Sequence, residues 1–202
     1  MDTKFIEYKI ENDIFYVGFG KNSKKSMTVL DEPTLKELNE IISDISEHQN
    51  GKVGVIFYSL LDNCFLAGAD ISMIDSLTEE SEAAAGAELG QKLYNMIEDL
   101  NIPTIACVSG PCLGGGLELS LSCDHLICSD DSKTSLGLPE VKLGILPGFG
   151  GTYRLPKKIG LPASLDLILA GKLVNSKKAK KIGLVAEVYP KENLLSQASK
   201  HL

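Results

Sequence analysis

Long apolar runs are absent from this sequence of 202 residues, and none reaches the 18 or more residues that a membrane-spanning helix requires. The N-terminal stretch MDTKFIEYKIEND is charged from its second residue onward and lacks the apolar core of a signal peptide. Hydrophobic residues make up 44% of the chain and charged residues 23%, which is ordinary for a globular protein. We therefore expect a globular protein without a membrane span.

Histidine is scarce, and the spacings typical of metal ligands are missing. The three histidines are scattered along the chain, and the five cysteines contain no CxxC pair. We therefore predict no metal site, and we interpret the cysteines as buried free thiols in a reducing compartment. Spacing leaves open a nucleophilic Cys or Ser paired with His, but no motif supports one. The chemistry of the chain is thus expected not to use imidazole.

An excess of basic residues is also missing. Lys and Arg number 20 against 27 Asp and Glu, and the formal net charge of −7 argues against a nucleic-acid-binding surface. The one lysine cluster is interpreted as the solvated face of a short helix; it comprises Lys177, Lys178, Lys180 and Lys181. Neither GxxxxGK[ST] nor GxGxxG occurs at a predicted strand–helix junction, so a nucleotide site is poorly supported.

Apolar patterning indicates strands alternating with helices. Strands are predicted at 5–10, 14–20, 53–59, 102–110, 125–130 and 184–190, the first two forming a hairpin. Helices are predicted after a cap at Asp31, in the Ala-rich region that ends near Leu100, at 161–171 and at 176–183. This alternation favours a single α/β domain built of β-β-α units.

Three glycine-rich segments differ from ordinary core or loop. FLAGAD (65–70) follows a strand, and CLGGGLEL (112–119) leads into a helix with a carboxylate, Glu118, in its first turn. GLPEVKLGILPGFGG (137–151) carries Glu140 and a further glycine cluster. Taken singly, each has an ordinary explanation: tight turns for the glycines, a first-turn helix carboxylate for Glu118, and a solvated loop position for Glu140.

Together, the same segments favour a catalytic interpretation. Backbone N–H groups from two loops that converge on one point can stabilise an oxyanion. Two carboxylates beside that point, partly desolvated, could act as general acid and base near neutral pH. The chemistry inferred from the residues is addition or proton transfer next to a carbonyl, and spacing does not say which carbonyl.

The motifs resemble those of the crotonase (enoyl-CoA hydratase/isomerase) superfamily. The likeness is carried by FLAGADISMI, IPTIACVSGPCLGGGLELSLSCD, KTSLGLPEVKLGILPGFGGTYRLPKKIG and LILAGKLVNSKKAKKIGLV, which run in family order. Within the superfamily, the sequence looks most like the N-terminal hydratase domains of multifunctional fatty-acid oxidation proteins (α subunits). The resemblance implies an α/β crotonase fold, a spiral of β-β-α units.

The resemblance also implies roles for individual residues. The backbone N–H groups of Ala69 and Gly115 would form the oxyanion hole for a thioester carbonyl. Glu140 would protonate the substrate's α-carbon, and Glu118 would orient and activate the water, with the backbone of Gly148 near it.

For the substrate's carrier, the resemblance implies a loop that lies against the adenine of coenzyme A, with contacts from Leu66, Asp70 and Ile71. Coenzyme A is then part of the substrate, and no metal or redox cofactor is expected. The family suggests a trimer or hexamer or, in a multifunctional protein, a complex with a thiolase. It also suggests a cytoplasmic location in a bacterium, or a mitochondrial one in a eukaryote, although no transit peptide is seen.

Family members usually have about 260 residues or more. We therefore expect residues 1–202 to form one hydratase domain that is incomplete at its C-terminus, with the C-terminal helical region truncated. The leading hypothesis is an enoyl-CoA hydratase of fatty-acid β-oxidation that converts 2-trans-enoyl-CoA to 3-hydroxyacyl-CoA. The alternatives are a Δ3-Δ2-enoyl-CoA isomerase, which could share the same site, and a non-catalytic CoA-binding or assembly module.

Overall fold

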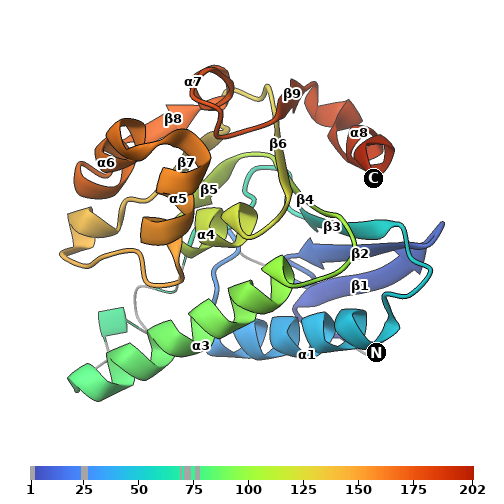
Figure 1. Ribbon diagram of the computed structural model, residues 1–202, viewed down its shortest axis with the longest axis horizontal. Helices are drawn as coiled ribbons and strands as arrows, with labels where there is room; N and C mark the ends of the chain where they lie inside the picture. Colours follow the sequence, from blue (N-terminus) through green and yellow to red (C-terminus); the bar gives the residue numbers. More distant parts are fainter. Residues whose placement is uncertain (1–2, 24–26, 69, 71–73, 76–77) are drawn as a thin grey trace.

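A six-stranded sheet forms the centre of the fold in the computed structural model, which describes residues 3–23, 27–68, 70, 74–75 and 78–202 (Figure 1). Its strands, in spatial order, are β1 (Ile6–Glu11), β2 (Ile14–Phe19), β3 (Gly54–Ser59), β4 (Thr104–Val108), β6 (His125–Ser129) and β9 (Glu187–Tyr189). The first pair is antiparallel, and every later neighbour pairs in parallel.

The predicted hairpin is confirmed by β1 and β2, which pair in register from Ile6 opposite Phe19 to Glu11 opposite Ile14. Asn12 and Asp13 form the turn with positive φ angles of 51° and 59°. Two successive residues with positive φ give the two-residue turn whose twist matches that of paired strands. This local chemistry explains why the hairpin could be predicted from the sequence.

Two long helices, α1 (Glu32–His48) and α3 (Glu80–Glu98), lie side by side across one face of this sheet (Figure 1). The inward stripe of α1 fits the predicted helical spacing, with Leu38, Ile41 and Ile45 completely buried. It packs into the main core of the molecule, which also contains Phe15 and Phe57 from the sheet. The amphipathic pattern of α1 therefore predicts which face of the helix packs into the core.

The start of α1 is fixed by the predicted cap, because a carboxylate oxygen of Asp31 accepts a hydrogen bond from the Thr34 N–H at 3.0 Å. We expect Asp31→Ala to lower the free energy of unfolding by about 1 kcal/mol, since that N–H would lose its acceptor. Urea denaturation measures the change. Asp31→Asn, which keeps a capping oxygen, serves as the control, and an equal loss in both variants would contradict a capping role.

The opposite face of the sheet is covered by α8 (Leu194–His201), which ends beside β3 and β4 (Figure 1). Leu194 and Ala198 of this helix form a second apolar cluster with Ile56, Ile105 and Ile127. The central strands are thus buried on both faces, which is why they have continuous apolar runs rather than an alternating pattern.

A second, three-stranded sheet was not predicted from the sequence. It consists of β5 (Pro111–Leu113), β7 (Ser135–Gly137) and β8 (Leu173–Asn175), in that order. Each strand has only three residues, which is too short for a periodic pattern to stand out.

The remaining elements are α4 (Gly115–Leu121), α5 (Gly151–Ile159), α6 (Leu161–Leu169), α7 (Ser176–Lys181) and the 3-10 helices η1 (Glu140–Leu143) and η2 (Lys191–Asn193).

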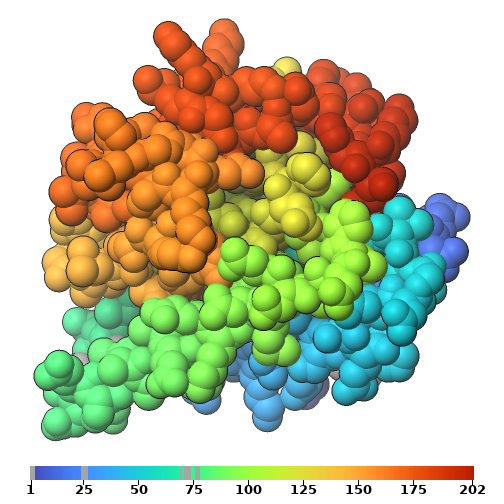
Figure 2. Space-filling model, in the orientation of Figure 1, coloured from blue at the N-terminus to red at the C-terminus, as the bar shows by residue number. Residues whose placement is uncertain are grey.

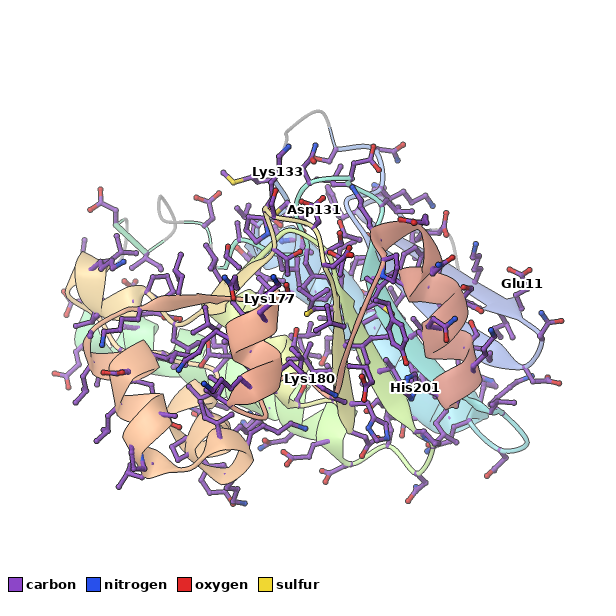
Figure 3. The ribbon with its side chains drawn as sticks, turned by 90° about the horizontal axis from the view of Figure 1, so that it is seen from above. Glu11, Asp131, Lys133, Lys177, Lys180 and His201 are labelled. Carbon is purple, nitrogen blue, oxygen red and sulfur yellow. The ribbon has the colours of Figure 1, made fainter. Side chains whose placement is uncertain are left out.

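On the surface, α3 runs below the segment around α5, and the two are in contact (Figure 2). The lysines of the predicted cluster are exposed on α7, which confirms the solvated helix face; Lys177 and Lys180 are seen in Figure 3. All five cysteines are free and buried, as predicted. Among the residues the structure describes, no helix combines the length and the apolar character needed to cross a membrane.

Candidate active site

The run of three glycines brings α4 unusually close to the preceding loop. Gly114 has a positive φ of 51°, and α4 begins at the next residue. A Cβ atom on Gly116 would lie 2.5 Å from the carbonyl oxygen of Leu66, so only glycine fits there. The glycines are therefore explained by close approach of two main chains, and this approach places Glu118 inside the molecule.

Glu118 is buried in the first turn of α4, with 2% of its surface exposed. Its Oε1 accepts hydrogen bonds from the N–H groups of Phe149 and Gly151, each at 2.8 Å. A Cβ atom on Gly151 would lie 2.9 Å from Cγ of Glu118, so the loop can approach only as glycine. One oxygen of the carboxylate is thus fixed by two main-chain donors.

The environment of Glu118 favours proton exchange near neutral pH. Burial raises the pKa of Glu118 to about 7, and the neighbouring carboxylate of Glu140 also raises it. The two main-chain hydrogen bonds and the positive charge of Arg154 act in the opposite direction. Desolvation is the largest of these effects, so this carboxyl group keeps its proton to a higher pH than an exposed glutamate does.

Glu140 is buried as well, with 9% exposure, rather than being a solvated loop residue. It begins η1, and burial raises its pKa, opposed by a hydrogen bond from its own N–H. Its Oε1 lies 2.8 Å from the place where a Cβ atom on Gly114 would be. Its Oε2 is buried and finds no hydrogen-bond partner within the described part of the chain. A buried carboxylate oxygen without a partner is costly unless a ligand or water binds it.

Two of the glycine-rich segments lie against each other, at Leu66 and Gly68 on one side and Leu113 and Gly114 on the other. The Leu113 N–H donates to the carbonyl oxygen of Leu66 at 2.9 Å, and a Cβ atom on Gly68 would lie 3.8 Å from Cα of Gly114. Gly115 is the first residue of α4, where N–H groups have no acceptor within the helix. The residue before it, Gly114, is the one that lies close to both Gly68 and the Glu140 carboxylate.

The comparison with protein families matches residues 9–202 to the family described as enoyl-CoA hydratase/isomerase. This chain belongs to the enoyl-CoA hydratase/isomerase family. Among curated relatives, the fatty acid oxidation complex subunit alpha of Vibrio campbellii is 46% identical over the whole chain, and that of Aliivibrio fischeri is 49% identical over 82% of it. The chain spans 28% of the length of the first of these relatives and 24% of the second.

Solved structures of the enoyl-CoA hydratase/isomerase family confirm the predicted crotonase fold. An enoyl-CoA hydratase of Geobacillus kaustophilus superposes with a TM-score of 0.92 at 31% identity, over 100% of this chain and 74% of its own. The enoyl-CoA hydratase of Bacillus anthracis gives a TM-score of 0.88 at 31% identity, over 98% of this chain and 75% of its own. The mixed α/β arrangement described above is thus that of the family.

Within this family fold, two of the predicted site residues lie outside the described residues, and the roles of the others concern contacts with a substrate. Ala69 and Ile71 are not among the residues described. Leu66 is fully buried in the core, and Asp70 is partly exposed. The carbonyl oxygen of Gly148 accepts a hydrogen bond from the Gln91 side chain at 2.8 Å. The roles assigned to these residues from the sequence remain predictions.

The main-chain donors to Glu118 were missed by sequence reasoning. The glycine cluster after Pro147 pointed to this loop, but a sequence does not show which N–H groups turn inward. The structure identifies them as those of Phe149 and Gly151.

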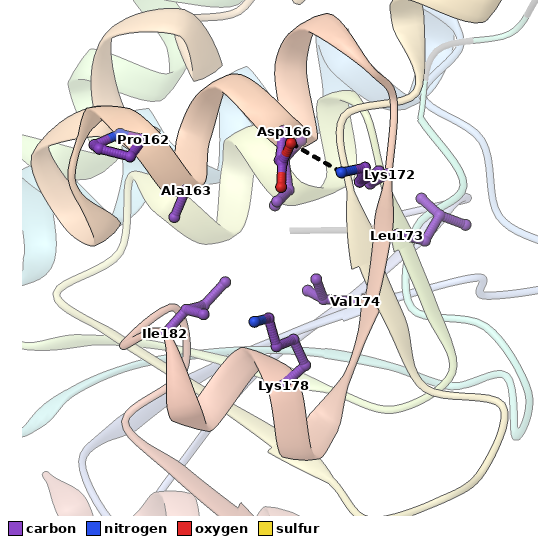
Figure 4. A pocket seen from close by; sticks show the side chains of 9 residues that line it. Pro162, Ala163, Asp166, Lys172, Leu173, Val174, Lys178 and Ile182 are labelled. Carbon is purple, nitrogen blue, oxygen red and sulfur yellow. Dashed lines mark hydrogen bonds and ion pairs between the residues drawn. The ribbon is translucent and has the colours of Figure 1, made fainter.

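A cavity of about 530 Å³ lies elsewhere, between α6, α7 and β8 (Figure 4). Its wall includes Leu167, Val174 and Ile182, together with Lys172 and Asp166, which form an ion pair at 2.9 Å. None of the predicted site residues lines it.

Proposed function

We propose that this chain hydrates 2-trans-enoyl-CoA thioesters to 3-hydroxyacyl-CoA, as a hydratase of fatty-acid β-oxidation. The observation that carries the proposal is the pair of buried carboxylates, Glu118 and Glu140, at the glycine-rich start of α4. Burial raises the pKa of both carboxyl groups, which suits general acid–base catalysis. The names of the α-subunit relatives support the same metabolic role.

In the proposed mechanism, each carboxylate has a separate task. Glu118, with Oε1 held by the loop, uses its other oxygen to accept a hydrogen bond from the attacking water. The water oxygen forms the bond to C3, while Glu140 donates its proton to C2. The proton that the water loses passes to the Glu140 carboxylate, which thereby regains the proton it gave to C2, so the net reaction adds H and OH across the double bond.

Negative charge builds up on the thioester oxygen as the water attacks. The N–H groups of Gly115 and Ala69 are the proposed donors to this oxygen, and the contact between Gly68 and Gly114 supports their convergence. Loss of one such donor typically costs about 2.7–4 kcal/mol of transition-state stabilisation. The glycine run would thus stabilise the enolate-like state through the main chain alone.

The reaction as proposed needs no metal or redox cofactor, because it transfers only water and protons. The loop containing Leu66, Asp70 and Ile71 is proposed to contact coenzyme A. Because the curated relatives are named as subunits of a fatty acid oxidation complex, we extend the proposal to assembly with further subunits, of which a thiolase is one candidate.

The test is incubation of the chain with crotonyl-CoA and, separately, with a 3-trans-enoyl-CoA, followed by chromatography of the products. Formation of 3-hydroxybutyryl-CoA from crotonyl-CoA is the expected result. Conversion of only the 3-enoyl substrate to its 2-enoyl isomer would replace the proposal with an isomerase. Binding of either thioester without turnover would instead indicate a non-catalytic module.

A further inference from the structure

One face of α3 holds the loop that binds Glu118. A Cβ atom on Gly90 would lie 2.2 Å from the Phe149 ring, so the ring can pack against the helix only because this residue has no side chain. The ring of Tyr94 meets it edge-on, with centroids 5.4 Å apart. Gln91 donates from the same face to the carbonyl oxygen of Gly148 at 2.8 Å.

Arg154 of α5 completes this contact with a buried positive charge, since only 6% of it is exposed. Its Nη2 donates to Asn95 Oδ1 at 2.6 Å and to Glu98 Oε2 at 2.9 Å. Its Nη1 donates to the carbonyl oxygen of Phe149 at 3.0 Å. Gly150 has a φ of +105°, and a Cβ atom there would lie 2.2 Å from Nη1, so the loop leaves room for the guanidinium group.

These hydrogen bonds form a short chain from Arg154 to Glu118. Arg154 holds the carbonyl end of Phe149, and the N–H end of the same residue holds Oε1 of Glu118. The two ends of one residue are therefore fixed between a cation and a carboxylate. The partner Glu98 is half exposed, so Arg154 could form this ion pair at the surface. The ion pair alone therefore does not explain why the arginine is buried.

The charge of Arg154 also acts directly on Glu118. Within the part of the chain that the structure describes, the titratable groups that interact with this carboxylate are Glu140 from η1, Tyr94 from α3 and Arg154 from α5. Among them, Arg154 is the cation, and it lowers the pKa of Glu118 against the effects of burial and of Glu140. It thereby favours the ionised form that can accept a hydrogen bond from water.

We infer that Arg154 is a positioning residue for the water-binding glutamate: it fixes the Phe149 main chain against Glu118 and supplies a buried positive charge at the other end of that residue. This inference rests on the function proposed above. It assigns to Arg154 no contact with the substrate, so its effect should appear in kcat and in the pH profile more than in KM.

The first test compares Arg154→Met with wild type in crotonyl-CoA hydration. We expect kcat to fall about 100-fold, because displacement of a catalytic group by about 1 Å has an effect of that size, while KM changes little. The acid limb of the kcat–pH profile should move to higher pH, because Glu118 then holds its proton more tightly. Lys92→Met is the matched control: Lys92 is an exposed lysine of α3 that forms an ion pair with Glu88 of the same helix.

The second test does not depend on activity. The pH dependence of the unfolding free energy is measured for Arg154→Met with Glu118 present and in a Glu118→Gln background. Compared with wild type, Arg154→Met should show a fall in unfolding free energy that extends to higher pH. This extension should be absent in the Glu118→Gln background. If wild type fails to hydrate crotonyl-CoA, the proposed function fails, and this measurement still decides whether Arg154 acts on Glu118.

Unchanged pH dependences, with or without a fall in kcat, would overturn the inference and leave Arg154 a purely structural residue. If Arg154→Met does not fold, Arg154→Lys keeps the charge and loses the forked geometry. It should then retain most of the wild-type pH profile while kcat falls. A profile displaced as far as expected for loss of the charge would contradict the electrostatic part of the inference.

Discussion

Replacing Glu140 with glutamine is expected to reduce hydration of crotonyl-CoA by about a thousandfold, within the range typical for the loss of a general acid–base group. The amide keeps the shape of the side chain but cannot give a proton to C2. Because burial already raises the pKa of Glu140, removing its charge relieves a desolvation cost and should not destabilise the fold. Initial rates and thermal unfolding, measured on the same samples, separate the two effects.

The matched control for this variant is Glu192→Gln, a glutamate exposed in η2, which should hydrate crotonyl-CoA at the wild-type rate. Equal turnover in Glu140→Gln and wild type would remove Glu140 from the proposed mechanism. A loss of turnover together with a large fall in unfolding temperature would show that the carboxylate is needed for the fold. That result would contradict the expectation from its Oε2, which has no hydrogen-bond partner among the described residues.

Replacing Glu118 with glutamine is expected to make the protein more stable above pH 7, by as much as about 3 kcal/mol. The folded-state pKa of Glu118 is raised to about 7 from its ordinary value of 4.5. Between these two values, the folded state binds more protons than the unfolded state, so the free energy of unfolding falls as pH rises. The variant lacks this contribution, and Glu140 contributes in the same direction in both proteins.

Urea denaturation between pH 4 and pH 9 measures the difference between the two proteins. The difference should be small near pH 4, should grow up to about pH 7 and should then level off, following the pKa of Glu118. Glu40→Gln, on the exposed face of α1, controls for loss of a carboxylate as such. A difference that does not vary with pH would mean that Glu118 is not a buried titrating group. Hydration should also be strongly reduced in Glu118→Gln, since water loses its acceptor.

Local signals in the sequence predicted the elements whose structure is decided locally. The β1–β2 hairpin follows from its turn residues, and the start of α1 follows from Asp31. By contrast, β5, β7 and β8 exist because their three-residue segments pair with one another, and no local pattern encodes that pairing. α5 was also missed, and it contains Pro156, which is unfavourable inside a helix.

The candidate site shows the same division. The glycines and the two glutamates could be identified because their residue types are unusual for their positions. The burial of Glu140 could not be predicted, because it depends on the approach of η1 to the start of α4. The contact between α3 and the Phe149 loop could not be predicted either. A glycine at position 90 of an Ala-rich helix does not indicate that an aromatic ring from a distant loop packs where its side chain would be.

The hydrogen bonds that hold the site together join parts of the chain that are far apart in sequence. Glu118 is separated by 31 and 33 residues from its two main-chain donors, and Arg154 by 59 and 56 residues from Asn95 and Glu98. Large loops must close before any of these contacts contributes, so the site is expected to form late in folding, after the helices and the hairpin. A partly folded chain could therefore have most of its secondary structure and still lack the arrangement of carboxylates on which the proposed chemistry depends.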